Sequence, residues 1–393
     1  MNKEPMITYL DYNAGAPIRP EALEVVVESL SEVGNASSIH QYGRKARRTV
    51  EEARIAVAEL VSANPQNVIF TSGGTEANVM ALSPTWYREG NPFEVSRLFV
   101  SSVEHPSVLS GGRFPVEKTS QLPVSKDGVV DLDELRGILQ EVPDGETALV
   151  SVMAANSETG VLQPLQQISV IVEDAGHLLH VDGVQVAGKS FVDLGLVGCN
   201  SFSISSHKIG GPQGVGALVL SSGSLRPAPL LNGGGQESWR RAGTENKSGI
   251  AGFAAAANAA LRELDSQEVI GFQTQLERGL KRISPDAVVF GEQSSRLANT
   301  TCFACPKIVA ETALIAFDLA GVAVSSGSAC SSGKVGVSHV LEAMGVGGDL
   351  ARGAIRVSYG WNSSCEDIDR FLEVWARIYE RMGPAKPLRS RAI

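Results

Sequence analysis

Leu178-Leu-His-Val-Asp182 and Ser201-Phe-Ser-Ile-Ser-Ser-His-Lys208 are the two segments that say most about the architecture of this chain. Each is a short run of strand-forming residues that ends in polar side chains. In an open α/β sheet, ligands bind at the edge where parallel strands end. We therefore expect Asp182 and Lys208 to face one functional edge of a sheet.

The same pattern extends outward along the chain in both directions. Segments with the periodicity of helices alternate with short apolar runs. This alternation predicts βαβ units and a mostly parallel sheet, and hence an α/β fold. The expected strands are 68–71, 98–101, 148–153, 178–182, 201–205 and 216–220. The expected helices between 21 and 90 are 21–30, 44–61 and one that begins at Thr75.

The pattern changes near residue 255. A long helical stretch over 250–283 precedes two short strands, at 288–291 and 299–304, and then two further helical segments. This predicts a large domain over residues 15–257. A smaller α+β domain is expected over 258–393, together with 1–14.

Composition excludes several classes of protein. The 393 residues include 34 Lys+Arg and 43 Asp+Glu, a net charge of −9, which argues against a nucleic acid as a direct partner. No apolar run is long enough to span a membrane, and the first residues lack the apolar core of a signal peptide. Five cysteines in a chain of this length do not make a disulfide framework. We expect a cytoplasmic protein with no membrane partner.

Lys208 and Asp182 suggest a particular chemistry. A lysine at a strand end is a nucleophile that forms Schiff bases, and pyridoxal phosphate needs such a lysine. The same cofactor needs a carboxylate beside its pyridine nitrogen, which Asp182 would supply. On their own, an Asp and a Lys on such loops are also ordinary surface residues.

Ser72-Gly-Gly-Thr-Glu is a strand-to-helix turn that suits a phosphate, because amides at a helix start face an anion. Ser205 and His207 flank the strand end that carries Lys208 and would add donors. The alternative is a plain glycine turn with a threonine cap. Neither the Walker motif nor the dinucleotide-binding glycine motif follows a strand.

Cys330 lies among small and flexible residues, in Ser325-Ser-Gly-Ser-Ala-Cys330-Ser-Ser-Gly. A thiol acts as a nucleophile only where it is accessible and ionisable, and this segment suits that role. Cys302 and Cys305 have CxxC spacing, but no second pair follows at zinc spacing, so we expect no metal there. His105 and Arg356 end or occupy strands and are candidates for ring stacking and for binding a carboxylate.

Together these motifs resemble the pyridoxal-phosphate-dependent cysteine desulfurases of iron–sulfur cluster and nitrogen-fixation systems, within the class V aminotransferase family. The resemblance covers the chain from Tyr9 to about Asp369. It rests on seven segments in family order: FTSGGTEAN (70–78), VEHPSV (103–108), VSVMAANSETG (150–160), HVDGVQ (180–185), SSHKIGGPQG (205–214), GGGQESWRRAGTEN (233–246) and SSGSAC (325–330).

The resemblance implies a fold-type I transferase. Its large domain would hold a seven-stranded, mostly parallel sheet between helices, and its smaller C-terminal domain would carry a mobile cysteine loop at about 325–338. The implied activity is removal of sulfur from L-cysteine, which gives L-alanine and a persulfide on Cys330. A sulfur-acceptor protein, either a cluster scaffold or a sulfur carrier, would then take the sulfur for iron–sulfur clusters, thio-cofactors or tRNA.

The resemblance also implies a role for each matching residue. Lys208 would hold the cofactor and move the Cα proton, His105 would stack on the ring, and Cys330 would attack the substrate sulfur. Cys330 is also a candidate transient iron–sulfur ligand, with no resident metal implied. The remaining residues implied to bind cofactor or substrate are Asp182 at the pyridine nitrogen, Gln185 at the ring hydroxyl, Gly74, Thr75, Ser205 and His207 at the phosphate, Thr244 at the phosphate of a neighbouring subunit in a homodimer, and Asn13, Asn156 and Arg356 at the substrate.

Two other activities fit the same scaffold, those of a selenocysteine lyase and of a class V aminotransferase acting on a small substrate. In either, Lys208 and the phosphate-binding residues would remain, and Cys330 would be dispensable or would only discriminate sulfur from selenium. A non-catalytic assembly partner is a third alternative, against which the intact Lys208 and Asp182 argue.

Overall fold

The computed structural model describes residues 7–264, 268–327 and 337–383. Its largest element is a seven-stranded sheet in which only β10 runs antiparallel to its neighbours. The α/β prediction with a mostly parallel sheet is therefore confirmed. The strands, in spatial order, are β2 (Val68–Thr71), β10 (Gly216–Leu220), β9 (Ser201–Ser205), β8 (Leu178–Asp182), β7 (Ala148–Met153), β5 (Arg97–Ser101) and β6 (Thr119–Leu122).

The two faces of this sheet are covered differently, because side chains alternate along each strand. In β9, Phe202 and Ile204 point into the main apolar core, where helices pack on one face. That core is formed with α1 (Pro20–Ser31), α2 (Gln41–Glu59), α5 (Leu132–Gln140), α6 (Leu165–Asp174), α7 (Leu194–Val197) and α8 (Lys247–Glu263).

The other face is covered by two helices and a small antiparallel sheet. Along β8 and β9 this second face of the sheet is buried but polar, because the side chains of His180, Ser201 and Ser203 lie on it. The covering elements are α3 (Gly74–Ala81), α4 (Pro106–Leu109), β3 (Thr85–Arg88), β4 (Asn91–Glu94) and β11 (Leu225–Pro227).

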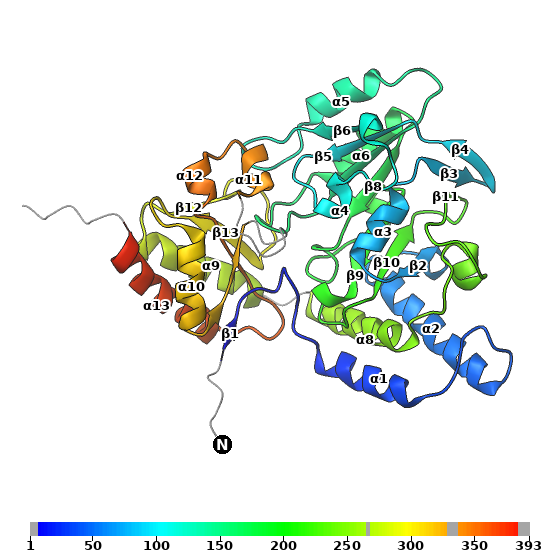
Figure 1. Ribbon diagram of the computed structural model, residues 1–393, viewed down its shortest axis with the longest axis horizontal. Coiled ribbons are helices and arrows are strands. Elements are labelled where there is room, and N and C mark those ends of the chain that lie inside the picture. The colour runs from blue at the N-terminus through cyan, green and yellow to red at the C-terminus, as the bar shows by residue number, and fades with distance from the viewer. Residues whose placement is uncertain (1–6, 265–267, 328–336, 384–393) are drawn as a thin grey trace, which may run out of the picture.

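The C-terminal part of the chain forms a second, smaller sheet covered by helices, at the left of Figure 1. A four-stranded sheet packs against long helices through a separate apolar core that includes Phe303, Phe371 and Trp375. Its elements are β12 (Val288–Val289), β13 (Thr300–Ala304), β16 (Ile355–Ser358), β15 (Ser325–Ser326), α9 (Glu268–Ile283), α10 (Ala310–Leu319), α11 (His339–Ala343), α12 (Gly348–Ala351) and α13 (Cys365–Met382). A reciprocal capping box between Ser364 and Asp367 fixes the start of α13.

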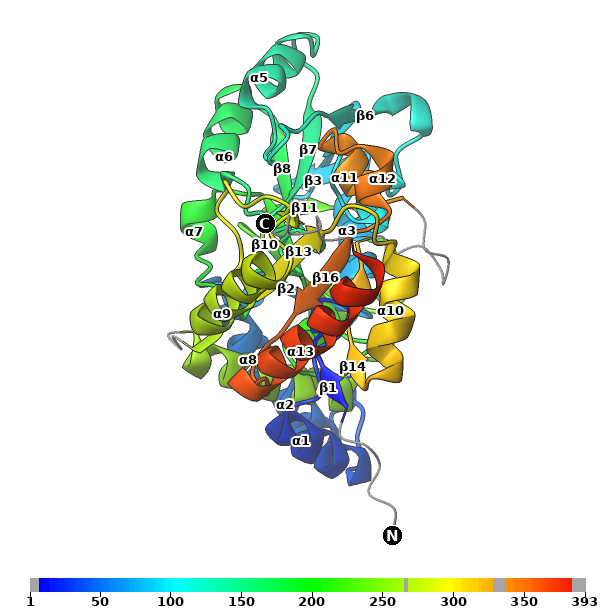
Figure 2. The same ribbon diagram turned by 90° about the vertical axis from the view of Figure 1, so that its left-hand side faces the viewer.

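The first described residues join this second part (Figures 1 and 2). β1 (Thr8–Tyr9) pairs in parallel with β14 (Val322–Ala323). Asp11 then bridges to Ser358 of β16, and Asn13 contacts Lys189 in the loop after β8. The segment that follows β1 therefore reaches from the smaller sheet to the edge of the large one.

The expected helical stretch 250–283 is in fact two helices, α8 and α9. The domain boundary at 257/258 stays a prediction, and α8 continues through it. None of the helices in the described residues is both long and apolar enough to cross a membrane.

Candidate active site

A cavity of about 310 Å³ lies at the carboxyl ends of the central strands. Because β2, β5, β7, β8 and β9 all end at this edge, the loops that follow them converge there. The sequence-predicted residues that line the cavity are Asn13, Gly74, Thr75, His105, Asp182, Gln185, Ser205, His207, Lys208 and Arg356.

Asp182, the last residue of β8, is a buried carboxylate held from two sides. Its Oδ2 accepts a hydrogen bond from Asn78 Nδ2 at 2.7 Å, and its Oδ1 accepts one from the main-chain N–H of Val184 at 3.0 Å. Burial and the nearby Asp182 raise the pKa of Glu104 well above its ordinary value. Glu104 therefore favours its neutral form beside Asp182.

A hydrogen-bonded chain behind Asp182 was not foreseen from the sequence. Since an ionised carboxylate only accepts, Asn78 must turn its NH₂ toward Asp182 and its carbonyl toward His180 Nε2, which lies 3.1 Å away. His180 Nδ1 contacts Ser201 Oγ at 2.9 Å, and burial lowers the pKa of His180 to about 3. A neutral imidazole with its proton on Nε2 donates to Asn78 Oδ1 and accepts from Ser201 Oγ at Nδ1, so both ring nitrogens have a partner.

Lys208 lies in a single 3₁₀ turn just after β9. Its Nζ donates to the main-chain oxygens of Asn13 and Ala14, so the N-terminal segment positions the amine. Burial, with help from Lys208 and Lys189, lowers the pKa of His207 to about 4. His207 is thus a neutral neighbour of the lysine at ordinary pH.

His105, in the turn that follows β5, caps the short helix α4. Its Nδ1 accepts from the main-chain N–H of Ser107 at 3.1 Å. Burial lowers the pKa of His105, against the opposing effect of Asp182. The neutral ring therefore carries its proton on Nε2.

The start of α3 forms a cradle that needs glycine. Gly73 has φ of +157°, and a Cβ added to Gly74 would lie 2.7 Å from Val184 Cγ2. The first N–H groups of a helix have no partner within the helix, and Thr75 and Ser205 line the same space. This arrangement fits a phosphate group.

Arg356 enters the cavity from β16 and is almost fully buried. Its Nη2 donates to Asp11 at 2.7 Å and its Nη1 to the carbonyl of Ser157 at 3.1 Å. Its Nε has no acceptor among the described residues. A guanidinium with a spare buried donor suits a small carboxylate ligand. No motif in the sequence indicates this role of Asp11.

Three predicted residues do not line the cavity. Asn156 is buried beside it, where its Oδ1 accepts from the main chain of Glu158 and Thr159, so a direct contact between Asn156 and a substrate stays a prediction. Thr244 is exposed in the segment before α8, and its role toward a second subunit also stays a prediction. Cys330 lies outside the described residues.

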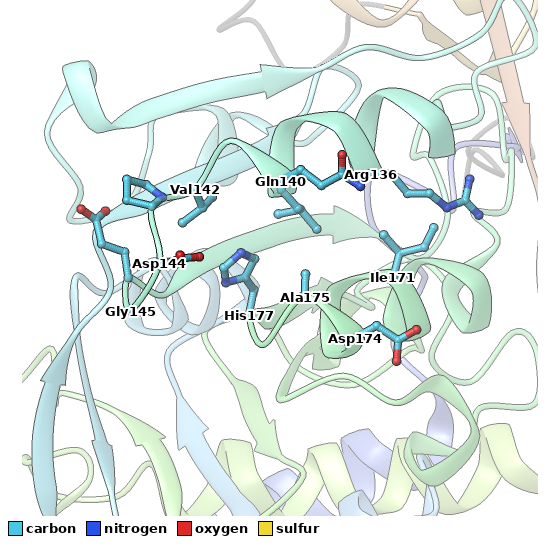
Figure 3. Close-up of a pocket in the computed structure, with 12 residues that line it drawn as sticks. Arg136, Gln140, Val142, Asp144, Gly145, Ile171, Asp174, Ala175 and His177 are labelled. Carbon is cyan, nitrogen blue, oxygen red and sulfur yellow. The ribbon is translucent and has the colours of Figure 1, made fainter.

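A second cavity, of about 460 Å³, lies between α5 and α6 (Figure 3). His177 in its wall directly precedes β8, and Glu146 shortly precedes β7. This cavity is therefore at the amino ends of the parallel strands, away from Lys208. Within 7–264, 268–327 and 337–383, no group of three His, Cys, Asp or Glu side chains could hold a metal ion.

Comparison with known proteins points to one family. Residues 8–371 match the family described as Aminotransferase class-V. The chain is 38% identical to cysteine desulfurase IscS of Dictyoglomus turgidum over 97% of both chains. It is also 38% identical to the IscS-like cysteine desulfurase of Mycobacterium tuberculosis, over 94% of this chain and 95% of that one. The solved NifS-like protein of Rickettsia africae superposes with a TM-score of 0.87 at 33% identity, over 96% of this chain and 100% of that one.

Proposed function

The chain belongs to the aminotransferase class-V family, and from that membership we propose that it is a cysteine desulfurase that depends on pyridoxal 5′-phosphate. The relatives at 38% identity carry that name and align along nearly the whole chain. The observation that carries the proposal is the meeting of Lys208, Asp182 and Arg356 around one cavity, although they come from three separate segments.

The cavity fits the cofactor by its chemistry. Gly74 leaves the space that a phosphate needs, while Ser205 and His207 lie beside it. Asp182 is a buried acceptor for a protonated ring nitrogen, and Lys208 is an amine within the same cavity. When bound, pyridoxal phosphate supplies an electrophilic carbon and a ring that accepts an electron pair.

The substrate would be held by its carboxylate on Arg356. The Lys208 amine would take the proton from Cα of L-cysteine, and the neutral His105 would stack on the ring and donate from Nε2. The thiolate of Cys330 would attack the substrate sulfur, so that the C–S bond breaks as an S–S bond forms. Free L-cysteine and the Cys330 thiol thus give L-alanine and a Cys330 persulfide, with no external oxidant or reductant.

Beyond the reaction itself, we propose a cytoplasmic homodimer in which Thr244 reaches the cofactor phosphate of the partner subunit. A sulfur-acceptor protein would take the sulfur from Cys330. The exposure of Thr244 is compatible with the first of these proposals.

The proposal is tested with the purified protein, pyridoxal phosphate and L-cysteine, by measuring alanine and protein-bound sulfur. Wild type should release alanine and gain one labile sulfur per chain, whereas Cys330→Ala should do neither. Lys208→Ala should bind the cofactor without the visible absorbance of the wild type. Alanine release by Cys330→Ala at the wild-type rate would exclude the thiol mechanism, and turnover of selenocysteine alone would identify a lyase instead.

A further inference from the structure

Lys189 is a second lysine next to the cavity for which the mechanism has no use. It follows β8 on the same loop as Gln185, and its Nζ contacts two side-chain oxygens. The distances are 2.8 Å to Gln185 Oε1 and 3.0 Å to Asn13 Oδ1. Both partners line the cavity.

These contacts fix which way the Gln185 amide points. Lys189 donates to Oε1, so Nε2 is on the other side, where it donates to the main-chain oxygen of Asn13 at 3.1 Å. A flipped amide would set Oε1 against that carbonyl oxygen and NH₂ against the Lys189 donor. Lys208 Nζ donates to the same Asn13 oxygen, so the amide of Gln185 and the amine of Lys208 share one acceptor.

We infer that Lys189 is a positioning residue, which holds the Gln185 amide with an N–H donor toward the cofactor and keeps the shared Asn13 acceptor in place under Lys208. This inference rests on the proposed function, because the role assigned to Lys189 is directed toward the cofactor that the proposed function requires.

The surroundings of Lys189 favour this role over that of a counter-charge. Among the described residues no carboxylate is bonded to Lys189, and the charged groups that act on it there are Lys208 and Arg356, both cationic. Burial, followed by these two like charges, lowers the pKa of Lys189 well below its ordinary value. The side chain is therefore suited to give hydrogen bonds rather than to add positive charge.

The test uses the full-length protein reconstituted with pyridoxal phosphate and measures the dissociation constant and the visible spectrum. Lys189→Met should weaken cofactor binding about tenfold and shift the absorbance maximum, because Gln185 Oε1 loses its Lys189 donor and Asn13 Oδ1 is left with Asn299 Nδ2 at 3.2 Å. Lys189→Ala should weaken cofactor binding in the same way. This variant is expected to fold even if Lys189→Met does not, since water can fill the space that the side chain leaves. Lys126→Met, at an exposed turn, is the matched control and should bind like wild type.

A double-mutant comparison separates positioning from general packing. If Lys189 acts through Gln185, Lys189→Ala should cost less than about twofold in a Gln185→Leu background. An equal loss in both backgrounds, or wild-type affinity and spectrum in both Lys189 variants, would overturn the inference. Failure of the wild type to bind pyridoxal phosphate would instead overturn the proposed function, so the two failures are distinguishable.

Discussion

Asn78 is the side chain that orients the Asp182 carboxylate most directly. Its NH₂ group donates to Asp182 and Ser107, and its side-chain oxygen accepts from His180. Both polar groups of the amide are therefore hydrogen-bonded within the protein. A single amide thus sets the tautomer of a buried imidazole and the orientation of a buried carboxylate.

Replacing Asn78 with Ala should lower the free energy of unfolding of the cofactor-free protein by ~1–3 kcal/mol. The reason is that the N–H of the fully buried His180 loses its acceptor. Urea unfolding measures the change. Asn67→Ala is the control: within the described residues this half-buried side-chain amide donates only to the main-chain oxygen of Ser221, so its loss should change stability by less than ~0.5 kcal/mol. Equal stability of the two variants would contradict the network.

The buried carboxyl group of Glu158 should make the stability of the folded protein depend on pH. Burial raises its pKa to about 7, although Ser338 donates to its Oε2. The ordinary pKa of this group is 4.5, so between these two values the folded state binds more protons than the unfolded state. Stability contributed by this group is therefore complete below pH 4.5 and is lost as the pH rises to about 7, by up to ~3 kcal/mol.

Glu158→Gln removes this titration and keeps an acceptor for Ser338. Its advantage in unfolding free energy over wild type should grow as the pH rises from about 5 to 7, as measured by urea unfolding at several pH values. Glu117→Gln, at an exposed position, should follow wild type throughout. A constant difference between Glu158→Gln and wild type would show that the carboxyl group does not titrate in this range.

At the scale of elements, α3 joins the large sheet to the phosphate cradle. The helix packs Ala77, Met80 and Ala81 against β2 and β10, so its amino end is held at the sheet edge. Gly74 at that end lies close to Val184 of the loop after β8. The cradle is therefore a contact between two elements and not a property of one loop.

Gly74→Ala should weaken binding of pyridoxal phosphate about tenfold or more, because the new methyl group meets Val184 at 2.7 Å and fills the cradle. Isothermal titration with the cofactor and with inorganic phosphate measures the loss. Gly137→Ala in α5 is the control, since nothing lies within 4 Å of the added Cβ. That variant should gain up to ~1 kcal/mol in stability and bind the cofactor normally. Normal binding by Gly74→Ala would place the phosphate elsewhere.

The sequence predicted the central strands well and the edge poorly. Runs such as 148–153 and 178–182 are rich in apolar residues and buried along their whole length, as central parallel strands usually are. β6, with the sequence Thr-Ser-Gln-Leu, was not expected, because three of its four residues are polar and it pairs only with β5 at the edge.

The motifs likewise indicated most of the polar residues that line the cavity, but not the role of Asn78, which lines it too. Asn78 and His180 meet only because α3 packs over β8, and nothing local in an Asn within a helix indicates a partner 102 residues away. Asp11 and Lys189 were missed for the same reason. Their contacts are set by tertiary packing, which a motif does not encode.

At the scale of the whole molecule, Asn13 connects the two sheets. Its side chain bonds Thr300 of β13 and Lys189 after β8, while its main-chain N–H donates to Ser358 of β16. One residue of the N-terminal segment thus ties the smaller sheet to the edge of the larger one.

Asn13→Ala should loosen this connection without unfolding either core. We expect faster amide hydrogen exchange in β13 and β16 and little change in β9 and β10, which are paired within the large sheet. Mass spectrometry of exchange reads each strand separately. Asn200→Ala, which removes an acceptor for Leu179 inside the large sheet only, is the control and should leave β13 and β16 as in wild type. Uniform exchange changes in both sheets would argue against a linking role.

The pairing of β1 with β14 has a consequence for synthesis on the ribosome. Thr8 is translated more than three hundred residues before its partner Val322. Until Val322 follows, β1 has no β14 to pair with, and the segment that carries the acceptors of Lys208 is not held in place. Retention of vitamin B6 by the newborn polypeptide is therefore expected only after Val322 has been translated.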